Sequence, residues 1–145
     1  MPAGLGLHPY FPRRPGARLW ARVGGVFPGP DLPASPPPTG WNWNEDQRID
    51  APVDHQFDGW GGLARVTWPD LGLVLEMSSE VRFLVVYAPP GEAYFCVEPV
   101  GHQLNAVNLS SGGGGHGMTV LAPGERVSIR VRFAVTDLSL APARA

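Results

Sequence analysis

The sequence predicts an all-β protein, built as an antiparallel β-sandwich. Glycine and proline are frequent, with 19 and 17 of the 145 residues, which favours many short strands joined by turns. Several segments alternate apolar and polar residues with the two-residue period of a strand. No segment of useful length has the period of a helix, and the chain is long enough for one domain with a real core.

Composition excludes several classes of protein. The formal net charge of −2 provides no electrostatic attraction to nucleic acid or to an anionic membrane. The only cysteine, Cys96, cannot form an internal disulfide, and its apolar neighbours indicate a packing role. No stretch approaches the roughly twenty apolar residues of a membrane span, and no signal peptide follows Met1. We therefore expect a cytoplasmic protein that binds neither nucleic acid nor membrane.

The first segment contains a histidine whose backbone is constrained by the next residue. His8 precedes Pro9, which keeps the backbone of His8 extended and holds the imidazole beside Tyr10 and Phe11. A turn histidine without a task fits this short segment equally well.

A strand is predicted over residues 17–23, where apolar side chains alternate with arginines that would face water. Arg13, Arg14 and Arg18 lie near one another, which also permits a phosphate site. No glycine-rich start of a helix accompanies them, so a solvated strand face is the simpler interpretation.

Prolines at six positions of segment 28–48 prevent regular hydrogen bonding and predict a loop. Trp41 and Trp43 either anchor this loop to the domain or stack on a sugar. After the loop, segment 49–60 combines three aspartates with His55 and Trp60. The spacing matches neither a calcium loop nor a zinc motif. Asp54, beside His55, is instead suited to hydrogen-bonding a polyol.

Segment 63–88 predicts three strands, 64–68, 73–77 and 81–87, the first two joined by a turn at 69–72. The third strand is almost continuously apolar, so we expect it to be covered on both faces.

The next strand, 94–100, contains a single carboxylate. Alternation puts Tyr94, Cys96, Glu98 and Val100 on one face. Burying a charged glutamate is costly. Either this strand lies at a sheet edge with Glu98 in water, or Glu98 lines a cleft with a raised pKa.

The end of the chain predicts a loop over 101–118, braced by Asn105 and Asn108, with the glycines 112–115 as a flexible connector. A final hairpin would join 117–121 to a half-buried strand ending at residue 135, in which alternate apolar side chains form one stripe. We expect a sandwich domain over 1–136 and a disordered tail over 137–145.

Motifs in segments 4–11, 54–57, 90–92 and 95–108 follow one another in an order that resembles the aldose 1-epimerase (galactose mutarotase) family. The resemblance covers residues 2 to about 135. It implies a galactose mutarotase-like supersandwich with an open sugar cleft, an aldohexose as substrate, no metal and no cofactor. It also implies that His8 and Glu98 are the catalytic pair and that Asp54 binds sugar.

Anomer interconversion needs a base for the C1 hydroxyl and an acid for the ring oxygen. Glu98 suits the first role and His8 the second, provided that they flank the sugar on opposite sides. The family has a further arginine and histidine upstream of these motifs, so the chain resembles a C-terminal half, whose exposed sheet edges predict self-association. Two alternatives stay open: a non-catalytic carbohydrate-binding sandwich, and a sugar-phosphate epimerase that uses Arg13, Arg14 or Arg18.

Overall fold

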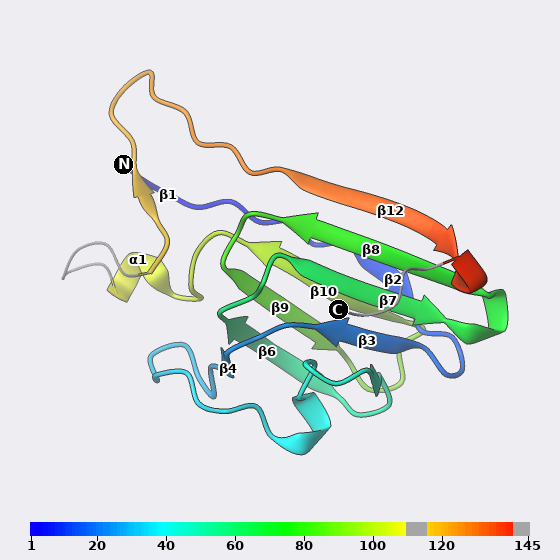
Figure 1. Cartoon of the computed structure of the whole chain (residues 1–145). Coiled ribbons are helices and arrows are strands. Elements are labelled where there is room, and N and C mark those ends of the chain that lie inside the picture. Colours follow the sequence, from blue (N-terminus) through cyan, green and yellow to red (C-terminus); the bar gives the residue numbers. More distant parts are fainter. Residues whose placement is uncertain (110–115, 141–145) are drawn as a thin grey trace.

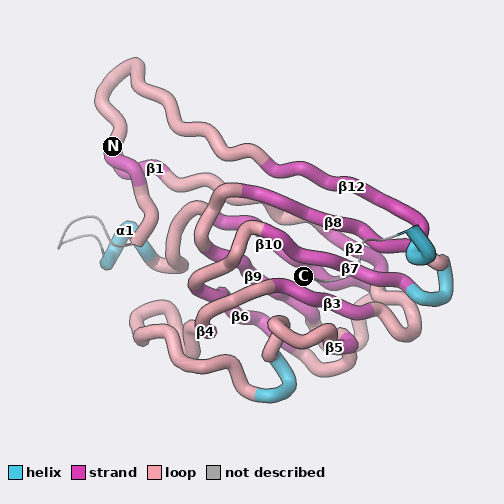
Figure 2. The backbone as a smooth tube through the Cα atoms, viewed as in Figure 1, coloured by secondary structure: helices cyan, strands magenta, loops and turns pink. Residues whose placement is uncertain are grey.

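The computed structural model describes residues 1–109 and 116–140, and most of its regular structure is β-strand. These described residues form two five-stranded sheets and one two-stranded sheet, and all strand pairs among them are antiparallel (Figures 1 and 2). The first large sheet contains, in spatial order, β2 (Tyr10–Pro12), β10 (Tyr94–Val100), β9 (Phe83–Ala88), β6 (Val53–Asp58) and β4 (Gly25–Val26).

The second large sheet contains, in spatial order, β12 (Val131–Asp137), β8 (Leu73–Ser79), β7 (Leu63–Trp68), β3 (Arg18–Ala21) and β5 (Gln47–Arg48). The small sheet pairs β1 (Pro2–Ala3) with β11 (Thr119–Val120). The described helical segments are short: α1 (Ala106–Leu109) and the 3-10 turns Thr39–Trp41, Pro69–Leu71 and Leu138–Leu140. None of the helices in these described ranges has the length and apolar composition needed to cross a membrane.

The core lies between the two large sheets, where each strand contributes every second side chain. From β10, Phe95 and Val97 are fully buried there, and β9 contributes Leu84 and Val86. A second, smaller apolar cluster lies on the other face of this sheet and consists of Phe27, Phe83, Val85 and Val100. The predicted all-β sandwich is therefore confirmed, and so is the expectation that β9 is covered on both faces.

Strand β10 is an interior strand, paired with β2 on one side and with β9 on the other. Its bounds agree with the predicted strand. The alternative that Glu98 lies on a sheet edge is wrong, because both neighbours cover the strand and leave Glu98 only 8% exposed.

The turn between β7 and β8 confirms another prediction. The 3-10 turn Pro69–Leu71 is capped by Gly72, which has a φ of 64° and donates its N–H to the carbonyl of Pro69. Glycine adopts this left-handed conformation without the steric cost that a Cβ brings.

The predicted final hairpin is wrong. Strand β11 pairs with β1, and β12 pairs with β8 instead of with β11. The expected half-buried stripe is also only partly formed: Ile129 and Val131 pack against the core, but Phe133 and Val135 are 42% and 58% exposed. Strand β12 is the outermost strand of its sheet, so these side chains lie at the margin of the sandwich (Figure 1).

The loop before β5 is anchored by its tryptophans, as one of the two interpretations predicted. Trp43 is almost completely buried, and Trp41 packs against the same core. In the segment predicted to be a tail, Asp137 ends β12 and Leu138–Leu140 form a 3-10 turn. The remaining tail residues and the glycines 112–115 lie outside the described residues.

Candidate functional site

The register between β10 and the N-terminal segment places His8 directly across from Glu98. Tyr10 is the partner of Cys96 on one side of this pair, and Gly6 forms a bridge with Val100 on the other side. The same register therefore continues through His8. The two side chains meet, with 3.3 Å between Nε2 of His8 and Oε1 of Glu98.

Two prolines border the pair. Leu7 donates its N–H to the carbonyl of Pro99 over 3.1 Å, but Pro99 has no N–H to return the bond. Pro9 likewise has no N–H to offer to β10. His8 is therefore held beside Glu98 by few backbone hydrogen bonds, and half of its side chain is exposed to solvent.

Burial of Glu98 is the main electrostatic feature of the site. Its pKa is raised above the ordinary value because burial disfavours the charged carboxylate; the nearby Asp54 raises it further, and His8 opposes the shift. A carboxyl group whose pKa lies closer to neutrality is better suited to accept and return a proton. Cys96, two residues earlier on the same face, has a pKa raised to about 11 by burial and by the charge of Glu98.

Three tyrosines surround this pair on the outer face of the sheet. Tyr10 stacks on the His8 ring, with centroids 4.9 Å apart and planes 20° from parallel. The ring centroids of Tyr94 and Tyr10 are 5.0 Å apart, and those of Tyr87 and Tyr94 are 6.5 Å apart. Sequence reasoning missed Tyr87, although its place in the alternation of β9, opposite Cys96, was a usable signal.

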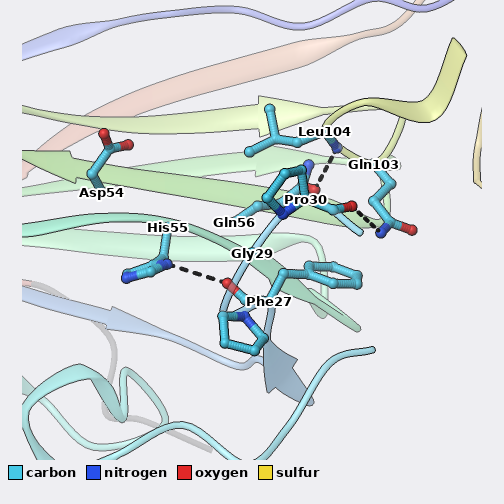
Figure 3. A pocket seen from close by; sticks show the side chains of 9 residues that line it. Phe27, Gly29, Pro30, Asp54, His55, Gln56, Gln103 and Leu104 are labelled. Atoms are coloured by element: carbon cyan, nitrogen blue, oxygen red, sulfur yellow. Dashed lines mark hydrogen bonds between the residues drawn. The ribbon is translucent and has the colours of Figure 1, made fainter. Parts of the chain in front are cut away.

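Asp54 lies on the same sheet, on β6, where it is the partner of Tyr87. Two hollows, of about 210 and 310 Å³, are both lined by Asp54 and His55. Figure 3 shows the first hollow between β6, the segment around Pro30 and the segment around Gln103. The structure therefore places the carboxylate of Asp54 beside both hollows and on the same sheet as the His8–Glu98 pair.

Gln56 braces the first hollow and was not recognised in the sequence. It is 1% exposed and donates to the carbonyl of His102 over 2.9 Å. It also accepts from the N–H of Leu104 over 2.7 Å (Figure 3). The predicted bracing role of Asn105 has a counterpart in its hydrogen bond to Asp31, 2.7 Å long. These contacts fix the loop that follows β10.

Other candidate residues are engaged elsewhere. His55 lies against Trp41, with ring centroids 4.4 Å apart, and its Nδ1 is 3.2 Å from the carbonyl of Phe27. Asp58 and Asp50, from the same acidic segment, form ion pairs with Arg82 and Arg48.

The three arginines considered as a phosphate site also have partners. Arg14 pairs with Asp70, and Arg18 pairs with Asp46. Arg13 donates to the carbonyl of Pro89 over 2.8 Å. Within the described ranges, the group of residues whose geometry could hold a metal ion is His8, Cys96 and Glu98.

The profile of the aldose 1-epimerase family matches residues 1–134. The uncharacterized protein YphB of Escherichia coli K12 is 28% identical over 161 aligned positions, which cover 92% of this chain and 51% of YphB. A crystal structure of a provisionally assigned aldose 1-epimerase from Escherichia coli K12 superposes with a TM-score of 0.83 at 25% identity, covering 95% of this chain and 52% of the other.

Two further crystal structures have the same fold. Protein Slr1438 of Synechocystis sp. PCC 6803 has a TM-score of 0.71 at 25% identity and covers 94% of this chain and 46% of its own. A galactose mutarotase-like protein of Clostridium acetobutylicum has a TM-score of 0.68 at 18% identity, with coverages of 94% and 48%. The chain thus spans about half the length of the relatives that it matches.

Proposed function

Because the chain belongs to the aldose 1-epimerase family, we propose that it interconverts the α and β anomers of an aldohexose by acid–base opening and closure of the sugar ring. The observation that carries this proposal is the contact between the half-exposed His8 and the buried Glu98. The proposed reaction needs one basic group and one acidic group acting together at the same carbon, which this contact supplies.

In the proposed reaction Glu98 gains one proton and His8 loses one, so the net number of protons on the pair does not change. In the starting state Glu98 is a carboxylate and His8 an imidazolium. Glu98 accepts the proton of the C1 hydroxyl while His8 donates one to the ring oxygen O5, so the C1–O5 bond breaks and an open-chain aldehyde forms. Rotation about the C1–C2 bond presents the other face of the carbonyl, and both protons return as the ring closes.

His8 and Glu98 are 3.3 Å apart in the structure, whereas we expected them to flank the sugar on opposite sides. The short separation is also compatible with the proposed chemistry. O1 and O5 are both bonded to C1, so the acid and the base act on two oxygens of the same carbon. The pair therefore has to part only far enough to admit the C1 edge of the ring. General acid and base groups held in place typically contribute about 10²- to 10⁴-fold to the rate.

Sugar binding is assigned to the surface between the pair and the two hollows. Asp54 accepts hydrogen bonds from hydroxyl groups far from C1. The faces of Tyr10, Tyr87 and Tyr94 suit the apolar C–H side of a pyranose. This division of polar and apolar contacts is typical of small-molecule sites.

Polarimetry tests the proposal. We expect the optical rotation of freshly dissolved α-galactose or α-glucose to change faster in the presence of the chain than in buffer alone. Glu98→Gln and His8→Asn should each abolish the acceleration, while Arg18→Gln, which lies on the other sheet, should retain it. A rate equal to that in buffer overturns the proposed activity of this chain.

Two further measurements address the alternatives: calorimetry for a chain without mutarotation, and phosphate inhibition for a chain that has it. Galactose binding that persists in Glu98→Gln, without mutarotation, would favour the non-catalytic carbohydrate-binding sandwich. Inhibition of mutarotation by inorganic phosphate would favour a sugar-phosphate substrate; insensitivity to phosphate would remove that alternative, in keeping with the carboxylate partners of Arg14 and Arg18.

A further inference from the structure

Cys96 lies beside the His8–Glu98 pair without a part in the proposed proton transfers. The ligand atoms of these three residues, an imidazole nitrogen, a thiol sulfur and a carboxylate oxygen, all lie within 4.8 Å of one another. Nitrogen, sulfur and oxygen donors of these types are the ligands of zinc in proteins, and catalytic zinc sites use three of them.

The spacing of the three donors is close to what a tetrahedral ion requires. Zinc bond lengths of about 2.0–2.3 Å put neighbouring ligand atoms roughly 3.2–3.8 Å apart. The nitrogen of His8 and the oxygen of Glu98 are already 3.3 Å apart. The ligand atoms all lie within 4.8 Å of one another, so the sulfur has to move by only about an ångström to reach the upper end of this range.

The backbone fixes two of the ligands in advance. Cys96 and Glu98 are two residues apart on one face of an interior strand, and each has a ladder partner on β9, Tyr87 and Val85 respectively. The third ligand, His8, is half exposed. Its exposed side gives an ion a path from solvent and leaves the fourth position to water.

We propose that His8, Cys96 and Glu98 form a three-ligand site for Zn²⁺ that shuts off the acid–base pair when occupied. Binding uses the neutral imidazole, the carboxylate and the thiolate, so the His8 imidazolium and the Cys96 thiol each release one proton to water as their bonds to zinc form. The ion then occupies the lone pairs that the ring-opening reaction needs. The inhibitory consequence rests on the proposed function, but the ion site itself does not.

Cobalt substitution tests the site without reference to activity. We expect Co²⁺ added to the reduced chain to produce the near-ultraviolet charge-transfer band of a cobalt–thiolate bond and the intense visible bands of tetrahedral cobalt, with saturation at one ion per chain. Stoichiometric Zn²⁺ should remove these bands. Cys96→Ser and Cys96→Ala should lack the thiolate band and bind Zn²⁺ at least about tenfold more weakly by calorimetry, while the control His55→Asn should match the parent chain.

Three outcomes would overturn the site: no thiolate band in the parent chain, equal Zn²⁺ affinity in the parent and both Cys96 variants, or equal loss in His55→Asn. Circular dichroism of the two Cys96 variants confirms that they are folded, and the pair of variants guards against a defect of either one. In an active chain, Zn²⁺ should inhibit mutarotation reversibly with a chelator, and Cys96→Ala should stay active but become insensitive to Zn²⁺. Cobalt binding in a chain without mutarotation would preserve the site and refute only the proposed function.

Discussion

Tyr10 lies flat against the imidazole of His8, and the two rings are 4.9 Å apart and only 20° from parallel. Tyr10 is held in place as the ladder partner of Cys96, whereas Pro9 and His8 precede the first residue of β2. The stacked ring thus sets the plane in which Nε2 of His8 approaches Glu98. Tyr10 is a positioning residue in this arrangement.

Tyr10→Ala should lower kcat for mutarotation by up to roughly tenfold, because an aromatic contact of this kind contributes about 0.5–1.5 kcal/mol. Tyr10→Phe keeps the ring and should keep the rate. Polarimetric kcat and KM for both variants provide the comparison, and Tyr10 is exposed enough that neither should unfold the chain. Equal kcat in the alanine variant and the parent would refute a positioning role.

Glu98→Gln should stabilise the fold at neutral pH while it abolishes catalysis. Because burial raises the pKa of Glu98 in the folded state, the folded chain holds its proton more tightly than the unfolded chain. The parent therefore loses stability as the pH rises from the unfolded pKa, near 4.5, through the higher folded pKa. The Glu98→Gln variant has no carboxyl group at this position, so its stability does not fall over this pH range for that reason.

Denaturant unfolding from pH 4 to pH 8 measures this effect. The free energies of unfolding of the parent and of Glu98→Gln should converge at the acidic end and diverge toward neutral pH, with the variant more stable. A variant that is less stable at pH 8 would mean that the His8 contact outweighs burial. Asp70→Asn, on the exposed Arg14 pair, serves as a carboxylate control that should not gain stability.

Gly62→Ala should destabilise the fold more than Gly72→Ala. Both glycines have positive φ, 79° and 64°, so alanine is strained by about 1–2 kcal/mol at either position. A Cβ at Gly62 would also lie 2.7 Å from the carbonyl oxygen of Ser79, whereas nothing lies within 4 Å at Gly72. Overpacking typically adds about 1–3 kcal/mol. Thermal unfolding of both variants measures the difference, and equal melting temperatures would contradict the close contact.

The exposed margin of β12 should promote self-association. Its outer edge has no strand partner among the described residues, and Val135 and Phe133 add apolar surface next to it. Val135→Lys should shift sedimentation toward the monomer, because a charge on an edge strand opposes edge-to-edge pairing. Leu32→Lys, at a leucine 53% exposed in a loop and not on a strand, should leave the distribution unchanged. A parent chain that is monomeric at all concentrations would refute the prediction.

The sequence predicted best where alternation and turns agree. The run from Tyr94 to Val100 has a clear two-residue period and is bounded by turn residues, and the structure has the same strand. The faces of its side chains also follow from this period. Whether the strand was interior or at an edge did not follow, because that depends on β2, a three-residue strand with little pattern of its own.

The site itself depends on registers that no local pattern contains. His8 and Glu98 were selected through a family resemblance, but their direct contact follows from how the N-terminal segment aligns with β10. Gln56 escaped notice because its partners lie about fifty positions away, at His102 and Leu104. Strand β12 shows the same limit: alternation identified its apolar face, but not that Phe133 and Val135 on it are exposed.

Pro9 and Pro99 have a consequence for the proposed entry of a sugar. Each lies where an ordinary residue would add a backbone hydrogen bond between the His8 segment and β10. Their lack of N–H groups makes this short part of the sheet mechanically compliant, while the paired strands on both sides of it stay stiff. If a sugar ring enters between the imidazole and the carboxylate as proposed, it displaces the less tethered His8 and leaves the pairing of Glu98 with β9 intact.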